Sequence, residues 1–238
     1  MPAIPRHRWR RSAVAGPGRR GHGKSLKRRI NRLADLARMV VEAFDAAIPD
    51  AGEVHLIGHS LSGVLVAAVA YIRARKIASV SLIAPAGLGP KIDAATLKGI
   101  TRASCAKSLS PWLHRLAATP DAISDDYVKA AMKLGRDPAL RACQADMAEM
   151  LFPDGVQAFD LRAALARLEP PTPVLWGRQD RILLHAQVLA FGGDLRFGRQ
   201  TECRDCVRGW HCGADQELSH WLWFRSRPPV IDRRRCRG

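Results

Sequence analysis

The residues best suited to chemistry lie in the run VHLIGHSLSG, residues 54–63, with Ser60 at its centre. Gly58 stands two residues before this serine and Ser62 stands two residues after it. A serine alcohol is a poor nucleophile unless a neighbouring base takes its proton. A sharp turn between a strand and a helix can present such a serine, and it requires small residues at these two flanking positions. The pattern predicts Ser60 as a nucleophile, with the backbone N–H of Leu61 directed at a developing oxyanion.

A structural role for the same serine is the main alternative. Serine is common at the N-cap of a helix, where its hydroxyl accepts a backbone hydrogen bond. Glycine is the usual residue at the position of Ser62, although a serine is small enough for such a turn. The surrounding residues predict a strand before Ser60 and a helix after it. This context favours a nucleophile over a simple cap.

A carboxylate suited to assist Ser60 lies much later in the chain. Asp180 occurs in the run LWGRQDRI, residues 175–182, directly after a predicted strand. In a catalytic triad, an aspartate holds the basic histidine in the correct tautomer and stabilises its cation. An aspartate in a loop also commonly caps a turn, which is the alternative role. The preceding strand favours Asp180 as the acid of a triad.

The elements that must position Ser60 follow from the apolar pattern. Residues 53–58 predict a short buried strand, residues 63–75 an apolar helix, and residues 77–84 a second strand. A strand, a helix and a strand at this spacing form a βαβ unit, so we expect a parallel sheet. Residues 172–176 predict a further strand just before the candidate acid.

Helical patterns fill most of the remaining chain. Apolar residues recur at three- and four-residue steps over residues 25–47, which predicts a helix ahead of the first strand. Residues 92–151 are mostly helical with no strand candidate, so we interpret them as a helical cap inserted between two strands. Short helices are expected at residues 161–168 and 185–191. From residue 192 onward the periodicity is poor and predicts neither a clear strand nor a clear helix.

Charge divides the chain into a neutral middle and two basic ends. The 238 residues include 38 Lys and Arg against 22 Asp and Glu, a formal net charge of +16. Residues 1–34 carry 11 basic residues and no acidic one, whereas residues 35–195 carry 17 of each. We expect a basic, disordered arm at residues 1–20, a globular core at residues 21–191, and an atypical tail rich in Arg, Cys and Trp at residues 192–238.

Several classes of partner are disfavoured by the composition. A basic arm can bind nucleic acid or an anionic surface, but Trp9 is the one aromatic residue in the first 43. A solvated terminus is therefore the favoured interpretation, and nucleic acid is not expected as a partner. The longest apolar stretch, residues 64–71, is too short to span a bilayer. The N-terminus does not resemble a secretory signal peptide, so a cytoplasmic protein is predicted.

Cysteines are concentrated in the tail. Cys203 and Cys206 form a CxxC pair, and His211, Cys212 and His220 follow. Such side chains could hold zinc. A single CxxC with irregularly spaced partners is a weak pattern, however, so no metal is predicted. In a cytoplasmic protein, disulfides are not expected either.

Three segments together resemble the α/β-hydrolase superfamily: VHLIGHSLSG at residues 54–63, SLIAPAGLGPKID at residues 81–93, and LWGRQDRI at residues 175–182. More narrowly, the chain is similar to the hydrolase-like domain of the acetoin dehydrogenase E2 component, a dihydrolipoamide acyltransferase. The run LFPDGVQAFDLRAAL at residues 151–165 is similar to the end of the helical cap in that group. RGHGKS at residues 20–25 is similar to a loop that, in such hydrolases, precedes the sharp turn carrying the nucleophile. This turn, residues 58–63 here, is called the elbow.

The resemblance implies an α/β-hydrolase fold, in which a parallel sheet carries a helical cap and Ser60 forms an acyl intermediate. It also implies a basic histidine well beyond the acid, and His211 is the best-positioned candidate, with His220 further along. A small acyl substrate is implied, with lipoamide as an acyl carrier in trans and no cofactor for the chemistry itself. The implied partners are other subunits of a 2-oxoacid or acetoin dehydrogenase complex.

Both ends of the chain depart from the family pattern. Few residues precede the elbow, and the Gly-His pair that usually carries the base does not follow Asp180. We therefore expect the early strands and an ordered C-terminal end to be missing, as in a truncated chain or one with ends in a shifted reading frame. The sequence supports a serine hydrolase or acyltransferase, and alternatively a catalytically inactive hydrolase-like fragment or binding module.

Overall fold

The computed structural model describes residues 30–48, 54–119 and 122–187, together with the backbone of two short strands at 200–203 and 222–224. Within these residues the helices are α1 (Leu33–Ala47), α2 (Leu61–Ile72), η1 (Ala74–Lys76), α3 (Ala94–Arg102), α4 (Ala106–His114), α5 (Asp125–Leu134), α6 (Pro138–Leu151), η3 (Pro153–Gly155) and α7 (Arg162–Leu165). The strands are β1 (Val54–His59), β2 (Ile77–Ile83), β3 (Val174–Gly177), β4 (Gln200–Cys203) and β5 (Leu222–Phe224).

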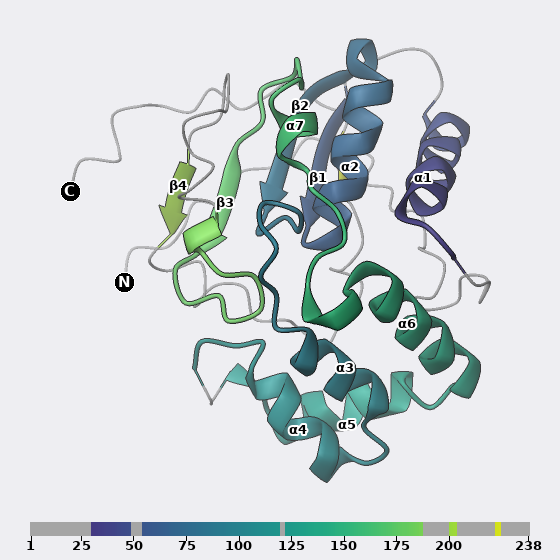
Figure 1. Ribbon diagram of the computed structural model, residues 1–238, viewed down its shortest axis with the longest axis vertical. Coiled ribbons are helices and arrows are strands. Elements are labelled where there is room, and N and C mark those ends of the chain that lie inside the picture. Colours follow the sequence, from purple (N-terminus) through teal and green to yellow (C-terminus); the bar gives the residue numbers. More distant parts are fainter. Residues whose placement is uncertain (1–29, 49–53, 120–121, 188–199, 204–221, 225–238) are drawn as a thin grey trace, which may run out of the picture.

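The described strands form one sheet in the order β4-β3-β2-β1-β5. Strands β1 to β4 run parallel, and β5 pairs antiparallel with β1. The unit β1-α2-β2 is the βαβ unit that the sequence predicts. Its two strands pair along their whole length, from Val54 opposite Ile77 to His59 opposite Ile83. The carboxyl ends of β1, β2 and β3 therefore lie at one edge of the sheet (Figure 1).

Helix α2 occupies the centre of the fold. It lies against the sheet, with α1 packed on its outer side (Figure 1). A helix enclosed in this way must be apolar around most of its circumference, which explains the run of Val, Leu and Ala between Val64 and Ala70. The largest fully buried side chains, Phe44, Leu36, Leu56, Leu65 and Leu82, come from α1, β1, α2 and β2 and form the centre of the core.

Helices α3 to α6, here called the helical cap, lie beyond the carboxyl ends of the parallel strands (Figure 1). They occupy the interval between β2 and β3 in which the sequence predicts helices and no strand. Part of the helical cap packs on the main core through Ala94, Met147 and Leu151. The remainder has a small apolar cluster of its own around Leu109, Leu113 and Val128. The helical cap is thus fixed to the core through α3 and α6, while α4 and α5 pack outside them.

Several boundaries differ from those expected. Helix α1 begins at Leu33 rather than at residue 25, because Arg32 is extended (φ −146°) and Ile30 is buried from a non-helical segment. Helix α2 begins earlier than predicted, at Leu61. The tail contributes β4 and β5, which the sequence pattern did not predict, because strands of four and three residues are too short to show a period.

Other expectations fall outside the described residues. They include the basic arm at residues 1–20, the RGHGKS loop at residues 20–25 and the absence of early strands ahead of β1. Over the part of the chain that the structure describes, no helix is long and apolar enough to cross a membrane.

Candidate active site

Ser60 occupies the sharp turn between β1 and α2 that the sequence predicts. Its backbone is left-handed, with φ 52° and ψ −122°. A non-glycine residue in such a region costs of order 1–3 kcal/mol and persists where its surroundings hold it in place. Three hydrogen bonds do so: Ser60 N donates to the Ile83 carbonyl (3.0 Å), while the Ser60 carbonyl accepts from Gly63 N (2.9 Å) and Ala86 N (3.2 Å).

The turn is so tight that its glycines cannot be replaced without displacing backbone. A Cβ atom on Gly58 would lie 2.6 Å from the Ser62 carbonyl oxygen and 2.7 Å from Gly63 Cα. A Cβ atom on Gly63 would lie 2.8 Å from Pro85 Cβ. Ser62, where glycine is usual, is 1% exposed, so the turn accommodates its small side chain in the interior. These close approaches are the physical reason for small residues on both sides of Ser60.

Leu61 is the first residue of α2, so its N–H has no acceptor within the helix. The positive end of the helix dipole lies at the same point. Such an N–H, adjacent to Ser60, can stabilise negative charge that develops on a carbonyl oxygen under attack.

Asp180 follows β3 in a compact turn. Its N–H donates to the Gly177 carbonyl (3.1 Å), and its Oδ1 accepts hydrogen bonds from Ile182 N (2.8 Å) and Leu183 N (2.9 Å). Burial raises the pKa of the Asp180 carboxyl, and these two N–H groups offset the rise only in part. Asp180 thus caps its turn with one oxygen, while no described residue donates a hydrogen bond to the other.

The parallel sheet brings Ser60 and Asp180 to the same edge. Ser60 follows β1, Asp180 follows β3, and β2 lies between these strands. Hydrogen bonds link the ends of the three strands in sequence, because Ser60 N donates to Ile83 and Ala84 N donates to the Leu175 carbonyl (2.8 Å). Ligands of open parallel sheets bind outside the carboxyl ends of the strands. The edge with Ser60 and Asp180 is therefore the candidate active site.

His211, the predicted base, lies outside the described residues, as do His220, Cys206 and Cys212. Within residues 30–48, 54–119 and 122–187, neither the Ser60 hydroxyl nor the Asp180 carboxylate bonds to a histidine. The candidate ligands of the zinc alternative lie in the same tail, so the structure does not test it. Among the described residues, no group of three or more His, Cys, Asp or Glu could hold a metal ion. The position of the base therefore stays a prediction.

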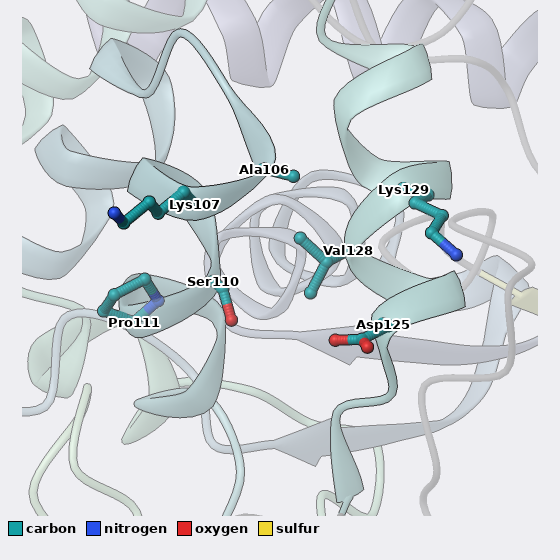
Figure 2. Close-up of a pocket in the computed structure, with 7 residues that line it drawn as sticks. All are labelled: Ala106, Lys107, Ser110, Pro111, Asp125, Val128 and Lys129. Atoms are coloured by element: carbon teal, nitrogen blue, oxygen red, sulfur yellow. The ribbon is translucent and has the colours of Figure 1, made fainter.

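A separate pocket lies between α4 and α5 in the helical cap, with a volume of about 380 Å³. Ser110, Val128 and Asp125 point into the space between these helices, whereas Lys107 and Lys129 point outward on opposite sides (Figure 2). No residue of the elbow or of the Asp180 turn lines it. This pocket is distinct from the candidate active site.

Gln157 lies near the candidate active site, although no sequence pattern indicated it. Gln157 is 6% exposed, and its side chain bonds to the loop that follows β2. That loop touches the elbow through Ala86. No local pattern marks a glutamine for such a role, because its partners lie about 70 residues earlier in the chain.

Comparison with known families agrees with this geometry. A model of the alpha/beta hydrolase family matches residues 3–230. The match covers nearly the whole chain, so the chain belongs to the α/β-hydrolase family. The resemblance stated from the three sequence segments is thereby confirmed, as is the expectation of a parallel sheet with helices.

Two similar proteins carry the same name, dihydrolipoyllysine-residue acetyltransferase component of acetoin cleaving system. The one from Pseudomonas putida is 31% identical over 164 residues, which are 68% of this chain and 43% of that protein. The one from Cupriavidus necator is 26% identical over 179 residues, 74% of this chain and 47% of that protein. The chain thus spans less than half of the length of these relatives.

Solved structures with the same fold include hydrolases. The 2-hydroxy-6-oxo-6-phenylhexa-2,4-dienoate hydrolase from Rhodococcus sp. strain RHA1 has a TM-score of 0.63 at 19% identity, covering 77% of this chain and 69% of that one. The meta-cleavage product hydrolase from Pseudomonas fluorescens IP01 has a TM-score of 0.61 at 15% identity, covering 77% and 68%. At such low identities the likeness shows the fold alone.

Proposed function

We propose that this protein is a serine-dependent hydrolase or acyltransferase that forms an acyl intermediate on Ser60. The observation that carries the proposal is the left-handed backbone of Ser60 at the carboxyl end of β1, on the same sheet edge as Asp180. A strained serine between a strand and a helix is the arrangement that exposes a nucleophile. Membership of the α/β-hydrolase family supports the same assignment.

In the proposed reaction, Ser60 Oγ attacks the carbonyl carbon of a small acyl substrate while a histidine takes the hydroxyl proton. We assign that role to His211 and the role of orienting it to Asp180. The Leu61 N–H donates to the oxyanion of the tetrahedral intermediate. The intermediate collapses, the leaving group departs with the proton from the histidine, and acyl-Ser60 remains.

The acceptor in the second step distinguishes a transferase from a hydrolase. We propose a dihydrolipoamide thiol as the acceptor, carried in trans, with water as the competing nucleophile. The thiol would give its proton to the histidine, and its sulfur would attack the acyl carbon. The bond from that carbon to Ser60 Oγ then breaks, and the histidine returns the proton to the Ser60 oxygen. The names of the two curated relatives support this choice, together with a partnership with other components of an acetoin-cleaving system.

An ester assay tests this proposal directly. Full-length protein mixed with 4-nitrophenyl acetate should release 4-nitrophenol, and added dihydrolipoamide should yield S-acetyldihydrolipoamide. Ser60→Ala should lower the formation of both products to the rate measured without protein, at which the thiol and water attack the ester directly. Ser62→Gly, which installs the usual elbow residue two positions away, is the matched control and should retain them. Ester turnover that persists in Ser60→Ala would rule out the proposed nucleophile, whereas turnover to acetate alone would leave a hydrolase.

A non-catalytic binding module is the second candidate. It is favoured by one feature of the sequence, that no Gly-His pair follows Asp180. In that case the folded protein would release no 4-nitrophenol above the Ser60→Ala background.

A further inference from the structure

The loop after β2, residues 85–92, lies directly against the elbow. Ala86 N donates to the Ser60 carbonyl (3.2 Å), so this loop is one of the groups that fix the backbone of the candidate nucleophile. Pro85 fills the space beside Gly63, where a Cβ atom would lie 2.8 Å from Pro85 Cβ. Any shift of this loop would therefore be transmitted to Ser60.

The side chain of Gln157 holds that loop in place. Its Oε1 accepts a hydrogen bond from Gly87 N (2.7 Å), and its Nε2 donates to the carbonyls of Gly89 (2.5 Å) and Lys91 (3.2 Å). Both donors of the amide and its acceptor are thus used on three backbone groups of one loop. Because Gln157 is 6% exposed, water cannot readily replace these bonds.

The surrounding contacts form the neck of the helical cap, where the chain leaves the sheet after β2 and returns after η3. Lys91 and Val156 form a β-bridge there, and Gln157 N donates to the Pro90 carbonyl (3.0 Å). Asp93 N donates to the carbonyl of Ile182 (2.9 Å), in the turn that Asp180 caps. Hydrogen bonds thus join this part of the chain both to the elbow, through Ala86, and to the turn that contains Asp180, through Asp93.

We propose that Gln157 is a positioning residue for the reaction at Ser60. It acts through the loop at residues 85–92, which its amide fixes in the conformation that supports the Ser60 backbone. This inference rests on the proposed function, because it assumes that Ser60 reacts. Gln157 does not touch the nucleophile, so its replacement should lower kcat and leave KM nearly unchanged.

The expected loss follows from the sensitivity of catalysis to geometry. A displacement of about 1 Å at a reacting group can cost roughly a hundredfold in rate. Gln157→Met retains much of the side-chain volume but removes the three side-chain hydrogen bonds to the loop and keeps the backbone bond to Pro90. Gln157→Glu retains an acceptor for Gly87 N but opposes the Gly89 and Lys91 carbonyls with a carboxylate oxygen. We expect each variant to react at Ser60 about tenfold to a hundredfold more slowly than the wild type.

The test measures the second-order rate of labelling of Ser60 by a fluorophosphonate, together with kcat and KM for 4-nitrophenyl acetate. Thr172→Val is the matched control for lost stability. Thr172 is 4% exposed and its Oγ1 donates to the Pro170 carbonyl (2.8 Å), just before β3 and at the opposite edge of the sheet from Ser60. It should lose thermal stability and still label at the wild-type rate.

Hydrogen exchange provides a readout that does not depend on reaction at Ser60. In the Gln157 variants, peptides that contain Ala86 and Gly87 should exchange their amide protons faster than in the wild type, and those from α1 should not. Labelling within twofold of the wild-type rate in folded Gln157→Met or Gln157→Glu would overturn the positioning role. Unchanged exchange at Ala86 and Gly87 would overturn it as well. A wild type that never labels would instead defeat the proposed function itself.

Discussion

Gly58→Ala should destabilise the protein severely, because it adds a methyl group where the elbow has no space. The added Cβ would lie 2.6 Å from the Ser62 carbonyl oxygen, 2.6 Å from Val66 Cγ2 and 2.7 Å from Gly63 Cα. Two of these atoms are backbone of the first turn of α2 and cannot rotate aside. Overpacking in a close-packed interior costs about 1–3 kcal/mol, and backbone displacement favours the upper end, about 3 kcal/mol.

Thermal and urea unfolding measure this loss. For a chain of this size, about 3 kcal/mol corresponds to a fall in Tm of roughly 6–12 °C. Gly135→Ala is the matched control, because its Cβ would approach nothing closer than the Ala131 carbonyl at 3.5 Å and its φ is −78°. It should be neutral or stabilising by up to about 1 kcal/mol. Surface substitutions usually change the free energy of unfolding by less than about 0.5 kcal/mol. If Gly58→Ala changes it by no more than that, the close contacts around Gly58 are wrong.

Three further predictions concern the candidate acid, the nucleophile turn and a surface thiol. Burial raises the pKa of the Asp180 carboxyl, so ionisation is costlier in the folded state than in the unfolded one. Asp180→Asn should therefore raise Tm at pH 7 while lowering activity. The gain in Tm should shrink as the pH falls through the folded-state pKa of Asp180, because the wild-type carboxyl then becomes neutral too. A difference in Tm between variant and wild type that stays constant from pH 7 to pH 4 would contradict the raised pKa. Ser60→Gly should be more stable in urea than Ser60→Ala by about 1 kcal/mol, because glycine tolerates the positive φ; equal stability would argue against a strained turn. A hydrogen bond with Ser108 lowers the pKa of the exposed Cys105 thiol, whereas burial raises that of Cys143. Peptide mapping after brief iodoacetamide treatment at pH 7 should therefore find Cys105 alkylated before Cys143, and the reverse order would refute this.

The elbow and the βαβ unit were predictable from sequence because consecutive residues carry the signal. Gly58 and Ser60 lie in one short run, and the strands on either side of α2 are short segments rich in Val, Ile and Leu. Asp180 could be placed for the same reason, since β3 directly precedes its turn. In a parallel sheet, the carboxyl ends of such strands meet at one edge whatever the rest of the chain does.

Long-range contacts were not predictable. Ile30 continues the apolar pattern of α1, yet it reaches the core from a segment that is not helical, so the helix starts later than the pattern indicates. Gln157 bonds to Gly87, 70 residues earlier, and no local sequence pattern around either residue predicts this contact. The catalytic base could not be located from sequence for a similar reason, because no recognisable strand or turn pattern precedes His211.

Reaction of Ser60 with a fluorophosphonate tests the central claim most directly. The tryptic peptide of residues 39–73 contains both Ser60 and Ser62, so fragment-ion mass spectrometry must assign the adduct to one of them. We predict an adduct on Ser60 of the native protein, lost in Ser60→Ala and after unfolding in urea. A folded wild-type protein with no adduct on this peptide, or with the adduct on Ser62, would contradict the account.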